Sequence, residues 1–140
     1  MADPETVARR WFREVWDEGR ESAIDELMAP DAVAHGLGGP PMRGPAEFKP
    51  FYRTFLNAFG DLEVQILRTV VQGDMVAVHC HVTARHVGEA LGGPATNKPV
   101  EFEGVTILRV VNGKIAEGWN AFDFLTMYQQ MGWVKTPVVP

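Results

Sequence analysis

Two polar side chains stand among aromatic residues near the end of the chain, in the stretch "AEGWNAFDFLTMYQQMG" (116–132). Asn120 carries an amide, which donates and accepts hydrogen bonds but has no usable proton affinity. It can therefore hold a ligand oxygen, but it cannot act as a general base. Asp123 stands where a strand-like pattern changes into a helix-like one. We expect Asn120 to line a pocket and Asp123 to cap the helix that follows it.

Histidine is the side chain whose reference pKa, about 6.5, best suits proton transfer near neutrality. His35 stands in "PDAVAHG", just before a glycine-rich loop, where it either points at the mouth of a pocket or is simply an exposed loop residue. His79 and His81 flank Cys80 on one predicted strand, so both emerge on the same face. Such a pair can bind a metal, but further ligands are not evident. We expect a solvated or interface face there, and no metal.

Other catalytic chemistries are poorly represented in the sequence. Ser22 is the only serine, which removes most serine-hydrolase readings. Cys80 lies between apolar strand positions and is expected to be core rather than a nucleophile. The stretch "HGLGGPPMRGP" (35–45) resembles a phosphate loop only loosely, because Pro41 takes the place of the third glycine and no strand–loop–helix unit surrounds it. We interpret it as a surface loop.

The first half of the chain is expected to supply helices. Asp3 is a good N-cap for a first amphipathic helix. Ser22 is expected to cap a shorter second helix, which Pro30 would end. A third helix opens at Pro45 and carries a row of aromatic residues on one face. Pro50 falls in its second turn, which should kink the helix or delay its start.

The second half changes to the alternating pattern of strands, joined partly by the short turns "QGD" and "VNGK". The predicted strands are Leu62–Val71, Met75–His86, Pro99–Val111 and Lys114–Phe122. Three helices followed by such a meander predict an α+β fold, a curved antiparallel sheet with three N-terminal helices on its concave face. Gly104 and Gly118 cannot fill space on that face. They either leave a hollow floored by Thr106 and Asn120 or sit at bulges of a bent sheet.

Composition limits the function further. The 140 residues suit a single domain, 1–140, and 46% of them are apolar. The net charge of −5 argues against nucleic-acid and membrane partners. A single cysteine, a charged N-terminus unlike a signal peptide and the lack of an apolar run of about 18 residues favour a cytoplasmic protein. The tail "KTPVVP" is expected to be loose or packed on a partner.

The order of several short motifs resembles a known family. "VWDEG…AIDELMAPDAVAHG", "GPAEFKPFYRTFLNAFGDLEV", "GDMVAV", "EFEGVTILRVVNGKIAEGWNAFD" and "QQMG" are similar to the SnoaL-like polyketide cyclases (ester cyclase-like proteins) of the NTF2-like superfamily. This resemblance implies a cone-shaped α+β barrel, a deep apolar pocket, commonly a homodimer, and no metal or organic cofactor. It also implies an intramolecular aldol reaction, in which an aspartate removes the proton beside a carbonyl and polar groups, including a histidine, bind the enolate.

The sequence departs from the family at the aspartate, because the family's W-D pattern reads Trp119-Asn120 here. His35 falls in the family's D/A-H-G segment. The first hypothesis is an enzyme that acts on a hydrophobic, polyketide-like carbonyl compound by aldol cyclisation, isomerisation or a related enolate reaction. Proton abstraction would then pass to His35, and Asn120 would donate a hydrogen bond to the substrate oxygen. Alternatives are a protein that binds a hydrophobic ligand without chemistry, and an epoxide-hydrolase-like hydrolase, whose Asp-Arg-Asp set cannot be placed on this pocket.

These considerations lead to specific structural expectations. We expect His35 and Asn120 to face one cavity. Its walls should include Phe12, Trp16, Tyr52, Phe55, Thr106 and Phe122. The core should include Trp11, Phe55, Phe59, Val76, Val78 and Leu108. The sheet face carrying His79, His81, Val105 and Ile107 should pack against a second copy of the chain.

Overall fold

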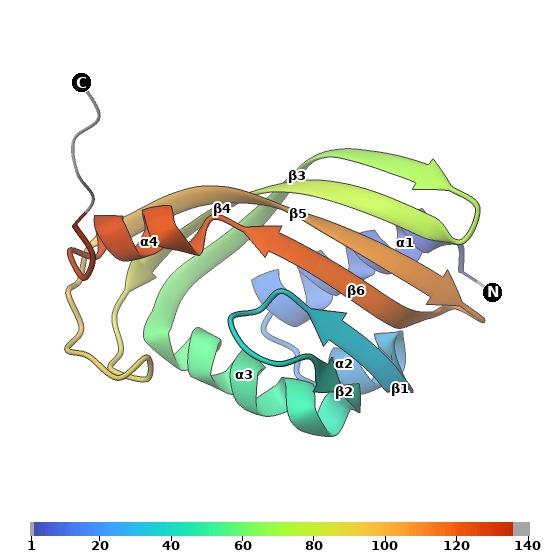
Figure 1. Cartoon of the computed structure of the whole chain (residues 1–140), viewed down its shortest axis with the longest axis horizontal. Coiled ribbons are helices and arrows are strands. Elements are labelled where there is room, and N and C mark those ends of the chain that lie inside the picture. The colour runs from blue at the N-terminus through green and yellow to red at the C-terminus, as the bar shows by residue number, and fades with distance from the viewer. Residues whose placement is uncertain (1, 136–140) are drawn as a thin grey trace.

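The computed structural model describes residues 2–135, and the expectation for the tail therefore concerns residues that lie almost entirely outside the described ones. The helices are α1 (Pro4–Arg10), η1 (Trp11–Asp17), α2 (Ser22–Leu27), α3 (Gly44–Ala58) and α4 (Phe124–Gln130). The strands are β1 (Met28–His35), β2 (Met42–Arg43), β3 (Phe59–Gln72), β4 (Met75–His86), β5 (Pro99–Val111) and β6 (Lys114–Phe122). They form a curved sheet, with most of the helices on its concave side (Figure 1).

The first helix begins as predicted and then changes its hydrogen-bonding pattern. The Asp3 carboxylate accepts a hydrogen bond from the Thr6 N–H at 2.8 Å and caps α1. From Trp11 the chain continues as the π-helix η1, and the Glu18 N–H donates to the Arg13 carbonyl at 2.8 Å, five residues back. Helical periodicity alone did not predict this change.

Two details of the predicted helices differ in the structure. Glu21, not Ser22, is the N-cap of α2, and Ser22 is the first helical residue. The helix α3 is continuous from Gly44 to Ala58, so Pro50 does not delay its start. Proline leaves the carbonyl four residues earlier unpaired, but both Ala46 and Pro50 are exposed. Water can therefore satisfy the carbonyl of Ala46, and the helix tolerates the proline.

The predicted meander is confirmed and extended. The bounds of β4, β5 and β6 agree with the prediction, while β3 begins three residues earlier, at Phe59. The sheet order is β2-β1-β6-β5-β4-β3, and β1 pairs with β6 in parallel. The sheet is therefore not wholly antiparallel, and it is open between β2 and β3 rather than a closed barrel. The alternating pattern of β1 is short and interrupted by Pro30, and for this reason the sequence did not predict a strand there.

The core lies between the concave side of the sheet and the helices. Of the six predicted core residues, Trp11, Phe59, Val76, Val78 and Leu108 are buried. Phe55 is only partly buried, because it faces a pocket. Within residues 2–135, no helix combines the length and the apolar character that crossing a bilayer requires.

Candidate functional site

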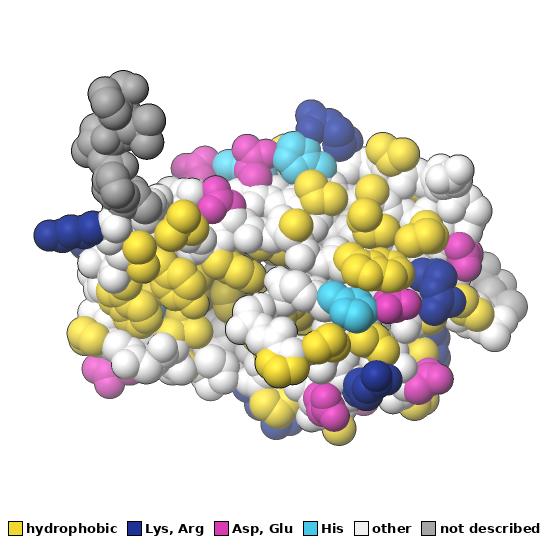
Figure 2. All heavy atoms as spheres, in the orientation of Figure 1, with side chains coloured by type: hydrophobic (Ala, Val, Ile, Leu, Met, Phe, Trp, Pro, Cys, Tyr) yellow, Lys and Arg dark blue, Asp and Glu magenta, His cyan; other side chains and the backbone are white. Residues whose placement is uncertain are grey.

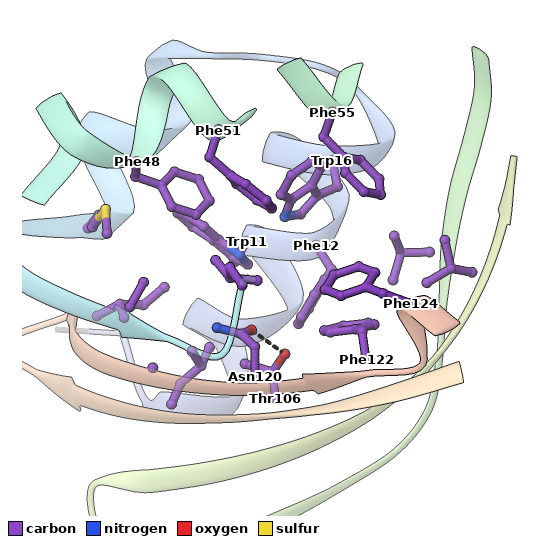
Figure 3. A pocket seen from close by; sticks show the side chains of 18 of the residues that line it. Trp11, Phe12, Trp16, Phe48, Phe51, Phe55, Thr106, Asn120, Phe122 and Phe124 are labelled. Carbon is purple, nitrogen blue, oxygen red and sulfur yellow. Dashed lines mark hydrogen bonds between the residues drawn. The ribbon is translucent and has the colours of Figure 1, made fainter. Parts of the chain in front are cut away.

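A pocket lies between the concave side of the sheet and the helices η1 and α3 (Figure 3). Its cavity volume is about 80 Å³, and the free space rises to about 770 Å³ when the opening to solvent is included. It is lined by Trp11, Phe12, Trp16, Met28, Val33, Ala34, Leu37, Phe48, Phe51, Phe55, Leu62, Val64, Val82, Phe102, Thr106, Leu108, Ile115, Gly118, Asn120, Phe122 and Phe124.

The helical wall of the pocket is aromatic because of two sequence spacings. On α3, Phe48, Phe51 and Phe55 recur three and four residues apart and therefore share one face. On η1, Trp11 and Trp16 are five residues apart. In an α-helix they would be about 140° apart around the axis. The five-residue hydrogen bonds of a π-helix instead place both indoles on the pocket side.

The floor of the pocket carries its polar side chains, Thr106 on β5 and Asn120 on β6, which are register partners. The Thr106 hydroxyl donates to Asn120 Oδ1 at 2.9 Å (Figure 3). Asn120 Nδ2 donates to the backbone carbonyl of His35 at 2.9 Å. A carbonyl only accepts, so this bond fixes which end of the amide is nitrogen. One N–H and one lone pair of the Asn120 amide are left for a ligand.

The pocket contains no ionisable side chain among its lining residues within 2–135. Cys80 is fully buried behind it, and this burial raises the pKa of its thiol to about 12, which makes it inert as a nucleophile. Within the described part of the chain, no three side chains of the metal-ligating types come together. His79 and His81 pair instead with Glu103 at 2.6 Å and Glu101 at 2.8 Å.

Most of the residues predicted to form the site line this pocket, namely Phe12, Trp16, Phe55, Thr106, Asn120 and Phe122. Tyr52 does not. Its side chain is buried, and its hydroxyl donates to the Val15 carbonyl at 2.9 Å. That carbonyl lies in the last turn of η1, where the helix itself provides no partner. Burial also raises the pKa of the Tyr52 phenol. The predicted ligand contact is therefore a structural link between η1 and α3.

The prediction that the His35 side chain faces the cavity is also wrong. Because β1 is a strand, its side chains alternate, and Ala34 lines the pocket while the next side chain turns away. His35 Nε2 lies 2.7 Å from Glu117 Oε2 on the outer face of the sheet, and the ring stacks on Trp119 at 5.8 Å. The hydrogen bond from His35 lowers the pKa of Glu117. Only the backbone carbonyl of His35 reaches Asn120.

The two glycines of the concave face have different surroundings. At Gly104, a Cβ would collide with the ring of Phe122, so the space is already filled. Gly118 lines the pocket beside Leu108, in agreement with the expectation that this glycine leaves a hollow. Ile115 also lines the pocket, although it is three positions from Gly118 and strict alternation would place the two on opposite faces of the strand. An irregularity in the β5–β6 register, next to Ile115, accounts for the difference.

Several pocket residues were not predicted. Trp11 was assigned to the core, and its 7% exposure agrees with that, but it also contributes to the pocket surface. Phe48 and Phe51 lie on the aromatic face that was recognised on the third helix. Leu37 and Phe124 could not be found by periodicity, because they lie just beyond the ends of strands. Asp123 caps α4 as predicted, accepting from the Thr126 N–H at 3.0 Å.

Comparisons with known proteins agree with this architecture. The family model for the SnoaL-like polyketide cyclases matches residues 6–131. The aklanonic acid methyl ester cyclase DauD of Streptomyces sp. (strain C5) is 29% identical over 117 residues, which cover 83% of this chain and 71% of that protein. The nogalonic acid methyl ester cyclase of Streptomyces nogalater is 27% identical over 123 residues, 84% of this chain and 89% of that protein.

Solved structures show the same likeness. The structure of IdmH, a putative polyketide cyclase from Streptomyces antibioticus, superposes with a TM-score of 0.81 at 28% identity, over 94% of this chain and 99% of that one. The sequence match spans both the helices and the sheet that enclose the pocket. The chain therefore belongs to the SnoaL-like polyketide cyclase family.

Proposed function

We propose that the protein is a cofactor-independent cyclase that closes a ring in a hydrophobic compound carrying carbonyl groups. The observation that carries this proposal is the Thr106–Asn120 pair on the floor of an aromatic pocket. Asn120 occupies the position at which the resemblance to the family places a catalytic aspartate. The two Streptomyces relatives reported above are named as cyclases of aklanonic acid methyl ester and nogalonic acid methyl ester, which supports a substrate of low polarity.

Asn120 supplies a hydrogen bond to the oxygen on which charge develops. Its Oδ1 end is held by Thr106 and one of its N–H groups by the His35 carbonyl, so the remaining N–H is already oriented. A donor held in this way needs no reorganisation during the reaction and is worth more in an apolar site than in water. The aromatic walls fold the substrate and keep its reacting carbons together.

The His35 ring cannot take the proton from a substrate in the pocket, because it lies on the outer face of the sheet. We assign proton transfer to the substrate itself. A carbon between two carbonyls enolises readily, and the enol carbon then attacks a second carbonyl carbon. The new C–C bond forms, the enol O–H becomes a ketone, and its proton passes through a water molecule to the new alkoxide. No proton is gained or lost overall, and no side-chain base is required.

A second candidate function is binding without catalysis. It is favoured by one observation: within residues 2–135, no ionisable side chain lines the pocket. The same fold supports both kinds of protein, so the fold cannot decide between them. A hydrolase with an Asp-Arg-Asp set receives no support from this lining.

The test is turnover of aromatic 1,3-diketones that carry a further ketone, followed by chromatography of the cyclised product. We expect ring closure by the wild type above the buffer rate. Asn120→Ala should lose roughly 100-fold or more, the worth of one oxyanion donor. His35→Gln should lose no more than a few-fold, and the rate should show no step with pH near neutrality.

Two results would contradict this assignment. Binding of the diketone without any turnover by the wild type would make the protein a binding module. A wild-type rate that rises through a pKa near neutrality, and that His35→Gln abolishes, would restore His35 as the base despite its position in the fold.

A further inference from the structure

We propose that the indole N–H groups of Trp11 and Trp16 form a second polar subsite, on the helical wall opposite Asn120, that binds a carbonyl oxygen of a neutral ligand. This inference rests on the proposed function in one respect only: it assumes that the pocket holds a ligand. It assigns a binding role to two atoms that otherwise belong to an apolar wall.

The first observation is that both donors lack a partner. In the described part of the chain, neither indole nitrogen makes a hydrogen bond, although Trp11 is only 7% exposed. Among the side-chain polar atoms of residues 2–135, His86 Nε2 alone is both unpartnered and sealed from solvent. The Trp11 N–H therefore keeps contact with solvent-accessible space, and Trp11 is one of the residues that line the pocket. Figure 3 shows the nitrogen atoms of both indoles on the edges turned towards the pocket interior.

The second observation is that the two rings are held in place. The Trp16 ring meets four rings of α3 at steep angles, with centroid distances of 5.2 to 6.3 Å to Phe48, Phe51, Tyr52 and Phe55. Trp11 packs on Phe48 at 5.3 Å. The hydrogen bond from Tyr52 to the Val15 carbonyl joins α3 to η1 between the two tryptophans. The direction of each N–H is thus set before a ligand arrives.

The chemistry of these atoms defines the group that they bind. An indole N–H donates and never accepts, so its partner must be an acceptor such as a ketone, ester or quinone oxygen. No cation lines the pocket within residues 2–135, so an ionised carboxylate would lose its hydration without gaining a charged partner. With Asn120 on the floor and the indoles on the helical wall, the site suits a flat neutral molecule that carries acceptor oxygens on two opposite edges.

The test compares anthraquinone, which has carbonyl oxygens on opposite edges, with anthracene, which has the same three rings and no oxygen. Binding of each compound is measured by equilibrium dialysis at sub-micromolar concentration. The readout is the preference ratio, the Kd for anthracene divided by the Kd for anthraquinone. Replacing Trp11 or Trp16 with 3-benzothienylalanine substitutes sulfur for the N–H and keeps the ring shape. The same replacement at Trp119, on the outer face of the sheet, is the matched control.

We expect the replacement at Trp11 or at Trp16 to lower the preference ratio roughly 2- to 10-fold, the usual worth of one neutral hydrogen bond. The replacement at Trp119 should leave the ratio unchanged. Anthraquinone-2-carboxylate should bind the wild type at least about 10-fold more weakly than anthraquinone. Trp11→Phe and Trp16→Phe provide a second pair of variants, and they should lower the same ratio even where the smaller ring weakens both compounds.

The outcomes separate this proposal from the proposed function. An unchanged ratio in all Trp11 and Trp16 variants would overturn the indole subsite while leaving the cyclase proposal intact. Equal binding of the carboxylate would overturn the neutral-ligand assignment. Failure of both anthracene and anthraquinone to bind would overturn the subsite together with the ligand pocket. Loss of turnover on diketones with a normal ratio would contradict the cyclase alone.

Discussion

The substitution Asn120→Asp tests the geometry of the pocket floor through the pKa of the introduced carboxyl. The oxygen that replaces Nδ2 would lie about 2.9 Å from the His35 carbonyl oxygen, where only a protonated carboxyl can donate a hydrogen bond. The apolar walls also disfavour the charged form, while the hydrogen bond from Thr106 partly offsets both effects. Asn120 is half-buried, so we expect a pKa of about 6, roughly 2 units above the value of an exposed aspartate.

This shift predicts a specific dependence of stability on pH. Two pKa units correspond to about 3 kcal/mol. Below about pH 4 the carboxyl is protonated in both the folded and the unfolded chain, and the variant should be nearly as stable as the wild type. Between about pH 4 and pH 6 only the unfolded chain releases its proton, so the free energy of unfolding falls as pH rises. Above about pH 6 the variant should be less stable by the full ~3 kcal/mol.

The measurement is urea unfolding at several pH values from 4 to 8, with the wild type and Asn112→Asp as controls. Asn112 is an exposed asparagine in the β5–β6 turn, with a φ of 53° that aspartate also tolerates. A variant that loses the same stability at every pH, or whose carboxyl titrates near 4, would refute the contact between Asn120 and the His35 carbonyl. If this variant gains ring-closing activity that the wild type lacks, the wild type is a binding protein or an enzyme of another kind.

Three further predictions concern the scaffold and its assembly. Tyr52→Phe should lower the free energy of unfolding, measured in urea, by about 1–3 kcal/mol, because it leaves the buried Val15 carbonyl unpaired. Glu14 has a pKa of about 2, chiefly because of its hydrogen bond from Arg10, so it stabilises the fold above about pH 4.5 and this contribution is lost as pH falls towards 2. Glu14→Gln should remove this pH dependence of the free energy of unfolding in urea titrations. The expected change is only about 1–2 kcal/mol, because the paired guanidinium groups keep contact with water. Finally, we propose that two chains pair through the outer sheet face, where Val105, Ile107 and Trp119 are 39%, 38% and 37% exposed. Figure 2 shows apolar side chains gathered on one face of the molecule. Ile107→Lys should then raise the dimer Kd at least about 30-fold in sedimentation experiments, whereas a monomeric wild type at micromolar concentration would contradict the pairing.

The sequence by itself determined the features that depend on neighbouring residues. Alternation and two short turns predicted β4, β5 and β6 with their observed bounds. The caps at Asp3 and Asp123 were predicted because a capping side chain bonds to a backbone N–H only three residues away. The placement of Asn120 on the pocket face followed from the period of a strand, and the chemical limit of an amide follows from its type alone.

Only the tertiary structure decided which side chains complete the pocket. His35 and Glu117 are 82 residues apart and meet because β1 joins β6 in parallel, a pairing that no local pattern encodes. That pairing turned the His35 ring outwards and left its carbonyl to orient Asn120. The change from α-helix to π-helix at Trp11, where the indole packs on Phe48 of α3, was likewise not predicted by the spacing of the apolar residues. Contacts between distant segments are set by the whole packed chain, and this is why the polar groups of the pocket became visible only in three dimensions.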